Sequence, residues 1–98
     1  MHQVFAAIVA DATSGAFSNT AKDRTLIVLA GGGFGGGTLT IEISPDDGVT
    51  FVDSGVTGLS AAGVMEVTIP DESQVQLVLT GATTSTLSAW SNLPIPTT

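Results

Sequence analysis

Few side chains in this 98-residue chain could do catalytic chemistry, and their positions argue against an active site. A Ser-His-Asp triad needs a histidine held rigidly between its partners, and the one histidine, His2, is next to the first residue. Glu42 and Glu66 are candidates for the two carboxylates of glycoside hydrolysis. Both alternate with apolar residues, which places them on the polar faces of strands, where a carboxylate is ordinarily solvated. We therefore expect that the protein is not an enzyme.

The glycine-rich run Gly31–Gly37 contains the spacing G-x-G-x-x-G. In dinucleotide-binding proteins these glycines open a helix whose N-terminus holds the pyrophosphate. Here the run leads into residues 38–44, whose alternation predicts a strand, and the Gly-Lys-Ser/Thr of a P-loop is missing. We expect no cofactor, and we interpret the run as a flexible loop between strands with Phe34 as its apolar anchor. The open alternative is a loop that adapts to the surface of a partner.

The most specific string in the chain is S-P-D-D-G-V-T-F, residues 44–51. It resembles the Asp-box, S-x-D-x-G-x-T-W, a strand–turn–strand hairpin found in many unrelated β proteins, including sialidase propellers. The resemblance implies that one aspartate bonds back to the hairpin backbone while the aromatic residue packs beneath it. The expected structural turn residues are Ser44, Asp46, Gly48, Thr50 and Phe51. Calcium held by Asp46 and Asp47 is the alternative, but the further ligands of an EF-hand loop are missing, so we expect no metal.

The composition excludes several further classes of function. Lys22 and Arg24 are the only Lys and Arg residues, against nine Asp and Glu, and the formal net charge is −7. Binding to nucleic acid or to an anionic membrane needs clustered basic residues, so we expect neither partner. There is no cysteine for a disulfide or a thiolate metal site. Because 43% of the residues are hydrophobic and 11% are charged, the chain is expected to fold.

The abundance of Thr, Val, Ser and Gly predicts an all-β fold. Turn signals recur at short intervals, which favours an antiparallel β-sandwich or a jelly-roll-like barrel of about seven to eight short strands. The chain is long enough for one domain, residues 1–92. Period-2 alternation and turn residues delimit the expected strands, at 4–10, 24–30, 38–44, 50–53, 65–69, 74–79 and 86–91, with a polar loop at 11–22.

Two of the expected strands are apolar on both faces, residues 4–10 and 25–30. A small antiparallel sandwich normally leaves one face of each strand to water, so surplus apolar faces predict contact with other chains. The C-terminal residues 93–98 contain Pro94 and Pro96 and are expected to form an extended tail, either frayed or docked on a neighbouring chain. The candidate interface residues are Val4, Phe5, Ile8, Ile27, Leu29, Phe34, Leu93 and Ile95.

Phe51 and Trp90 are candidate platforms for sugar stacking. Carbohydrate-binding sandwiches usually present several aromatic side chains, whereas aromatic residues make up 5% of this chain and tyrosine is absent. Packing in the core is therefore the expected role of both rings.

The order of motifs is similar to that of a known group of proteins. A strand ending in a Gly-rich loop is followed by G-T-L-T-x-E-x-S-x-D-x-G-x-T-F, then by G-x-x-x-V-x-I-P and by L-x-L-T-G-A-T-x-S-T-L. Over roughly residues 25–92 the chain resembles the small β-sandwich virion proteins of tailed bacteriophages, which are decoration, cement or fibre-base components. No catalytic residues come with this resemblance.

The resemblance implies a symmetric homo-oligomer, favoured as a trimer, bound to the major capsid protein or to a tail shell protein. The expected function is that of a capsid decoration or cement protein that stabilises the assembled shell. Its expected location is the outer surface of the head or tail, because an acidic chain suits an outer surface better than a lumen packed with DNA. The alternative is a carbohydrate-binding or host-surface-binding module.

Overall fold

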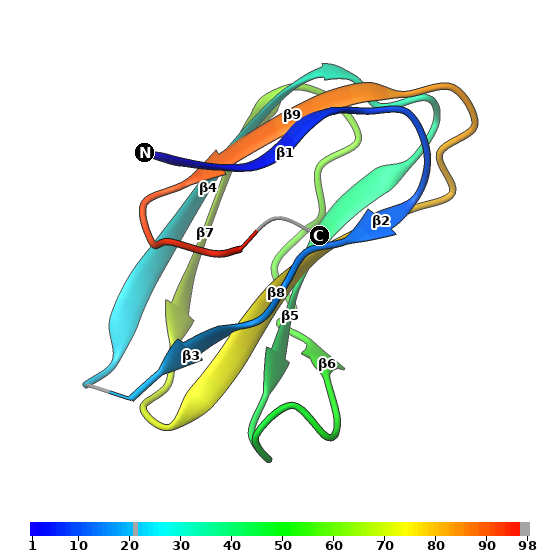
Figure 1. The fold of residues 1–98 in the computed structure, drawn as a ribbon. Helices are drawn as coiled ribbons and strands as arrows, with labels where there is room; N and C mark the ends of the chain where they lie inside the picture. The colour runs from blue at the N-terminus through cyan, green and yellow to red at the C-terminus, as the bar shows by residue number, and fades with distance from the viewer. Residues whose placement is uncertain (21, 97–98) are drawn as a thin grey trace.

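The fold is all-β and contains two antiparallel sheets (Figure 1). A computed structural model describes residues 1–20 and 22–96 of the chain. Within these residues there are nine strands: β1 (His2–Ile8), β2 (Ala12–Thr13), β3 (Phe17–Asn19), β4 (Arg24–Gly33), β5 (Thr38–Ser44), β6 (Val52–Asp53), β7 (Gly63–Ile69), β8 (Ser73–Thr80) and β9 (Thr86–Ser91). The expected all-β class is confirmed, and β6 is shorter than the predicted strand 50–53.

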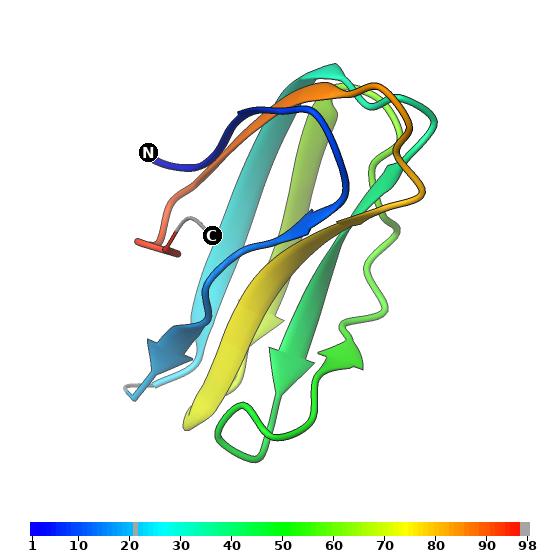
Figure 2. The ribbon, with the colours of Figure 1, turned by 45° about the vertical axis from the view of Figure 1, so that its right-hand side comes forward.

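The two sheets pack face to face as a β-sandwich (Figure 2). Sheet A has the strand order β1-β9-β4-β7. Sheet B has the order β2-β8-β5-β6. Strand β3 pairs with the same edge of β8 as β2 does, but nearer the start of β8. The chain passes repeatedly between the sheets, so their inner faces are built from interleaved parts of the sequence.

The core lies between the inner faces of the two sheets. The alternation expected for β5, β7 and β8 is present. The buried positions of β8 recur at every second residue, and Ile43 of β5 and Val67 of β7 are partly buried and pack against the core at their inward positions. Sixteen apolar side chains of the described residues are buried, and the largest in sheet B include Leu39, Ile41 and Leu77. Every buried side-chain N or O atom of the described residues has a hydrogen-bond partner, as a stable interior requires.

The first strand does not expose Val4 and Phe5, which were expected at an interface with another chain. Val4 and Phe5 are neighbours in sequence, yet both are buried in the core of the single chain. Their pairing with β9 shifts between Gln3 and Phe5 and again between Phe5 and Ile8, where Ala7 has a φ of 48°. A β-bulge adds a residue to one strand and so directs consecutive side chains inward. Val4 and Phe5 are therefore not available to a neighbour, and Ile8 is half-buried.

The polar segment 11–22, expected to be a loop, includes strands β2 and β3. Ala12 pairs with Leu79 and Phe17 with Val75, so both strands line the same edge of β8. The bend between them is held by Ser14, whose Oγ accepts a hydrogen bond from the Leu77 N–H at 2.9 Å. The prediction failed because the small polar residues obscure the short strand pairing.

The glycine run is also more regular than expected. Strand β4 continues through Gly33, with Gly31 pairing with Ser88 across the sheet. The remaining residues form a tight turn in which the Gly37 N–H donates to the Phe34 carbonyl at 2.9 Å. Phe34 anchors this turn in the core and is buried, so it is not an exposed interface residue.

The tail packs on its own domain over the part that is described. Ile95 is 2% exposed and belongs to the core, while Leu93 packs against the core half-buried. The Gly15 N–H donates to the Pro96 carbonyl at 3.0 Å. Ile95 therefore does not dock on a neighbouring chain, and the final two positions of the expected tail, 97–98, lie outside the described residues.

We predict that Ile95→Ala lowers the free energy of unfolding by about 2–4 kcal/mol, because it leaves a cavity in the core. Urea denaturation measures this change. Val49→Ala, at a site that is 83% exposed, is the matched control and should change stability by less than about 0.5 kcal/mol. An equally small effect of Ile95→Ala would mean that the tail is frayed in solution.

Candidate functional site

The Asp-box-like hairpin is organised by two side chains. The Ser44 hydroxyl donates to the Asp46 carboxylate at 2.8 Å and accepts from the Gly48 N–H at 2.9 Å. Asp46 also accepts from the Thr50 N–H at 2.8 Å. These hydrogen bonds join residues of the turn to one another, so the turn is stabilised by contacts within the hairpin itself. Phe51 is half-buried directly before β6.

Two adjacent residues of this turn have a left-handed backbone. Asp47 has a φ of 62° and Gly48 a φ of 86°. Asp tolerates this conformation better than most residues, and glycine adopts it without steric cost. The Asp47 carboxylate accepts from the Gln74 side-chain amide at 3.0 Å, which ties the turn to β8.

The hydrogen bonds of the turn also favour the ionised form of the Asp46 carboxylate. The bond from the Thr50 N–H and then the bond from the Ser44 hydroxyl lower the pKa of Asp46 below its ordinary 3.8, because both favour the ionised carboxylate. Asp46 therefore remains ionised to a lower pH than an aspartate without these hydrogen bonds.

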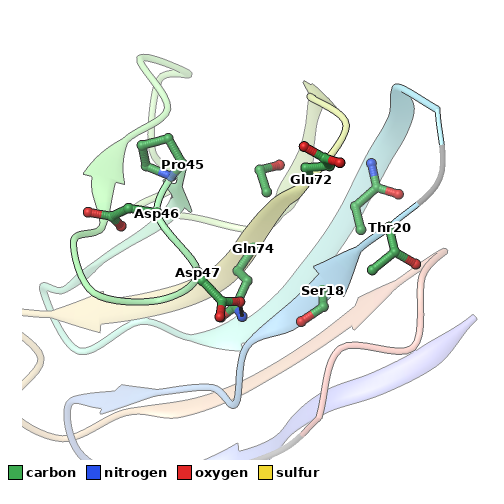
Figure 3. Close-up of a pocket in the computed structure, with 9 residues that line it drawn as sticks. Ser18, Thr20, Pro45, Asp46, Asp47, Glu72 and Gln74 are labelled. Carbon is green, nitrogen blue, oxygen red and sulfur yellow. Dashed lines mark hydrogen bonds between the residues drawn. The ribbon is translucent and has the colours of Figure 1, made fainter.

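A shallow cavity of about 330 Å³ lies beside this hairpin, at the end of sheet B (Figure 3). The residues that line it are mainly of polar types: Ser18, Asn19, Thr20, Pro45, Asp46, Asp47, Glu72, Ser73 and Gln74. In Figure 3 the side chains of Asp47 and Gln74 point toward one another. No aromatic ring is among the lining residues, so this cavity lacks the stacking surface on which sugar rings usually lie.

The other sequence-level candidates for chemistry are not brought together. Glu42 is in sheet B, where it accepts from the Gln76 side-chain amide at 2.9 Å, whereas Glu66 is in sheet A. The two glutamates therefore do not form a catalytic pair, and His2 is exposed at the start of β1. No group of three or more His, Cys, Asp or Glu suited to a metal occurs within residues 1–20 and 22–96. The same residues include no helix with the length and apolar character needed to cross a membrane.

The outer face of sheet A carries an apolar stripe that crosses three strands. Cross-strand pairing places Trp90 beside Leu29 and Leu29 beside Val64. Leu29 is 41% and Val64 is 57% exposed, and Trp90 is half-buried on this face. Ile27, half-buried, lies two residues along β4 on the same face. We call Trp90, Leu29, Val64 and Ile27 the apolar stripe.

The stripe corrects and extends the sequence interpretation. Ile27 and Leu29 were expected at an interface, and both lie on the outer face of the sheet. Trp90 was expected in the core, but its neighbours Ala89 and Ser91 are the inward residues of β9. Val64 was missed because it precedes the alternating segment 65–69, and alternation itself places it on the outer face.

The outer face of sheet B has the opposite character. Cross-strand pairs on this face are mainly polar, such as Glu42 with Gln76 and Ser44 with Gln74. Glu42 also lies directly opposite Asp53 on β6. Two carboxylates in such a pair repel one another, so this face is best placed in water. The outer face of sheet A thus carries the apolar stripe with Glu66 beside Ile27, whereas the outer face of sheet B is mainly polar and carries the pair Glu42 and Asp53.

We predict that Gly48→Val destabilises the protein by roughly 1–3 kcal/mol, because a β-branched residue resists a positive φ. A Cβ at this position would also lie 2.8 Å from the Gln74 Oε1 atom. Thermal and urea unfolding check the change. Gly36→Val has the same backbone strain but open space around it, so it should destabilise the protein less than Gly48→Val. EDTA should leave the melting temperature of the wild type unchanged; a marked fall would restore the calcium hypothesis.

We predict that the Asp46 hydrogen bonds stabilise the fold above about pH 4 and lose this effect as the pH falls through the lowered pKa of the folded state. The sign follows because a carboxylate with a lowered folded pKa binds its proton more weakly in the folded than in the unfolded chain. Melting temperatures of wild type and Asp46→Asn, measured from pH 7 to pH 2, should differ most at neutral pH and converge in acid. A constant difference would contradict the assignment.

Comparisons with protein-family models, curated proteins and solved structures find no significant match to this chain. The surfaces and contacts of the molecule are therefore the observations that bear on its function.

Proposed function

We propose that the protein is a structural virion protein of a tailed phage, a decoration or cement protein that binds an assembled shell and stabilises it. The single observation that carries this proposal is the contrast between the apolar stripe on sheet A and the acidic outer face of sheet B. The motif resemblance of residues 25–92 supplies the class of partner.

The apolar stripe is the surface proposed to contact the shell. Exposed apolar residues gathered in one row on a rigid sheet are typical of protein-binding surfaces. The centre of the row, Leu29, lies on β4, which is hydrogen-bonded to strands on both sides. A rigid strand loses little conformational freedom on binding, so the contact area contributes efficiently to affinity.

The acidic residues are placed where they would remain in water. Glu42 and Asp53 lie on the outer face of sheet B, and Asp46 and Asp47 lie in the hairpin beside it. Within the strands of sheet A the single acidic residue is Glu66. A particle coated with this chain would therefore expose negative charge, which favours solubility.

Shell stabilisation needs no chemistry from the chain itself. A protein that binds only the assembled state stabilises that state by mass action. Many weak contacts, repeated over a symmetric shell, also gain from effective concentration. This mechanism agrees with a binding surface built from apolar and backbone groups.

We predict that particles assembled without the protein release their DNA at a lower temperature than particles that carry it. The Leu29→Asn/Val64→Asn double variant should lose about tenfold or more in shell affinity, since burial of two partly exposed apolar side chains is worth on the order of 1–2 kcal/mol. DNA-dye fluorescence on heating, with quantified occupancy, measures both effects.

Val49→Asn is the matched control, because it removes an equally apolar and 83% exposed side chain from the hairpin at sheet B. It should bind the shell like the wild type. Equal release temperatures with and without the protein would reject the cement function. Binding to a glycan array that is lost in Trp90→Ala would favour the carbohydrate-binding alternative.

A further inference from the structure

Strand β7 forms a long, regular and open edge of sheet A. Its seven residues Gly63–Ile69 pair with β4 at seven consecutive positions, without a register shift. The opposite edge, β1, is interrupted by two register shifts, and β6 at the edge of sheet B is two residues long. Bulges, shortness, proline and charged side chains are the usual protections of an edge strand, and of these β7 has one charged residue, Glu66.

The hydrogen bonds of β4 show which groups of β7 point outward. The Asn92 N–H donates to the Ile27 carbonyl at 3.1 Å, and the Ile27 N–H donates to Asn92 Oδ1 at 2.8 Å. The backbone N–H and C=O groups of odd-numbered β4 residues therefore point toward β9, and those of even-numbered residues bond to β7. Alternation then directs the N–H and C=O groups of Val64, Glu66 and Thr68 away from the sheet. All three residues are exposed, and no hydrogen bond within the described part of the chain uses these groups.

We propose that a second copy of this chain pairs antiparallel along β7, about a twofold axis, so that two copies of sheet A form one continuous eight-stranded sheet. Such an interface uses the same surface on both copies, which matches a sheet A in which β7 is long and regular and the other described edge, β1, is bulged. A closed ring of three would need a second, different regular edge, and the bulged β1 is a poor one. The geometry thus points to a twofold pair in place of the trimer that the resemblance implies.

Glu66 restricts the register of this pair. Hydrogen bonding requires that outward-directed residues face one another, so Glu66 lies opposite Val64, Glu66 or Thr68 of the second copy. Two carboxylates directly opposite one another repel, which disfavours the middle register. The registers that place Glu66 opposite Val64 or Thr68 are therefore favoured.

Charge elsewhere on the chain is compatible with the pairing. The acidic turn at Asp71 and Glu72 follows β7, whereas the segment 54–62 that precedes β7 has no charged residue. Because the strands run antiparallel, the acidic turn of one copy lies near the uncharged segment of the other. Repulsion from more distant acidic groups is screened over about 8 Å at physiological salt.

The pairing would also join the two apolar stripes. Val64 is the end of the stripe at the β7 edge, and the twofold axis keeps both outer faces on the same side of the combined sheet. The second copy would continue the row from its own Val64 to its Leu29 and Trp90. This step deepens the proposed function and rests on it: a doubled stripe binds a shell with two linked contacts in place of one.

The experiment is sedimentation of the full chain from micromolar to millimolar concentration, with hydrogen exchange at both limits. Wild type should approach twice the 9.8 kDa chain mass, with concentration-dependent protection of the Val64, Glu66 and Thr68 amides. Glu66→Pro should remain at 9.8 kDa, because proline removes an outward N–H without removing a bond to β4. Thr68→Pro tests the same edge independently should Glu66→Pro fold poorly.

Glu66→Gln is the matched control, since it keeps the N–H and removes the charge. It should pair about two- to fivefold more tightly than wild type. A wild type that stays monomeric at millimolar concentration would overturn the pairing and leave shell binding through the stripe untouched. A dimer that survives both proline variants but is lost in Leu29→Asn would also overturn it. A wild type that dimerises but does not bind the shell would instead reject the proposed function alone.

Discussion

The packing of two inner sheet faces against one another is the interaction on which the rest of the molecule depends. A 98-residue chain without cysteine has no disulfide, so apolar burial is the main source of stability that offsets the ordering of its backbone. Each end of the sandwich therefore adds apolar side chains to the same core. Bulges turn Val4 and Phe5 inward, a tight turn seats Phe34, and the C-terminal segment returns to seat Ile95.

Much of this arrangement could be predicted from the sequence because strand alternation is a local signal. The segment 38–44 and the inward residues of β7 and β8 were predicted correctly, since apolar and polar residues alternate there. The Asp-box-like string also located the hairpin whose Ser44 and Asp46 bonds are now observed. These features depend on residues that are close in sequence.

The errors occur where pairing partners are far apart. Nothing local in Val4–Phe5 reveals that β9 opposes them with one residue fewer, so the strand was expected to expose an apolar face. Trp90 was expected in the core because the chain has few aromatic residues for a sugar-binding surface, but its register beside Leu29 places it outside. The short strands β2 and β3 exist because β8 offers them an edge. Long-range register, unlike alternation, is a property of the assembled sheets.

The division of the surface follows from the same geometry. A strand has two faces, and the core uses one, so the second face of β4 and β7 is free to carry another function. In sheet B these positions hold Glu42 and Gln76, which interact well with water, whereas in sheet A they hold Leu29 and Val64, which do not. The apolar stripe contributes nothing to the core. Apolar surface in water has an unfavourable free energy of hydration, and contact of the stripe with another protein would remove that unfavourable contribution.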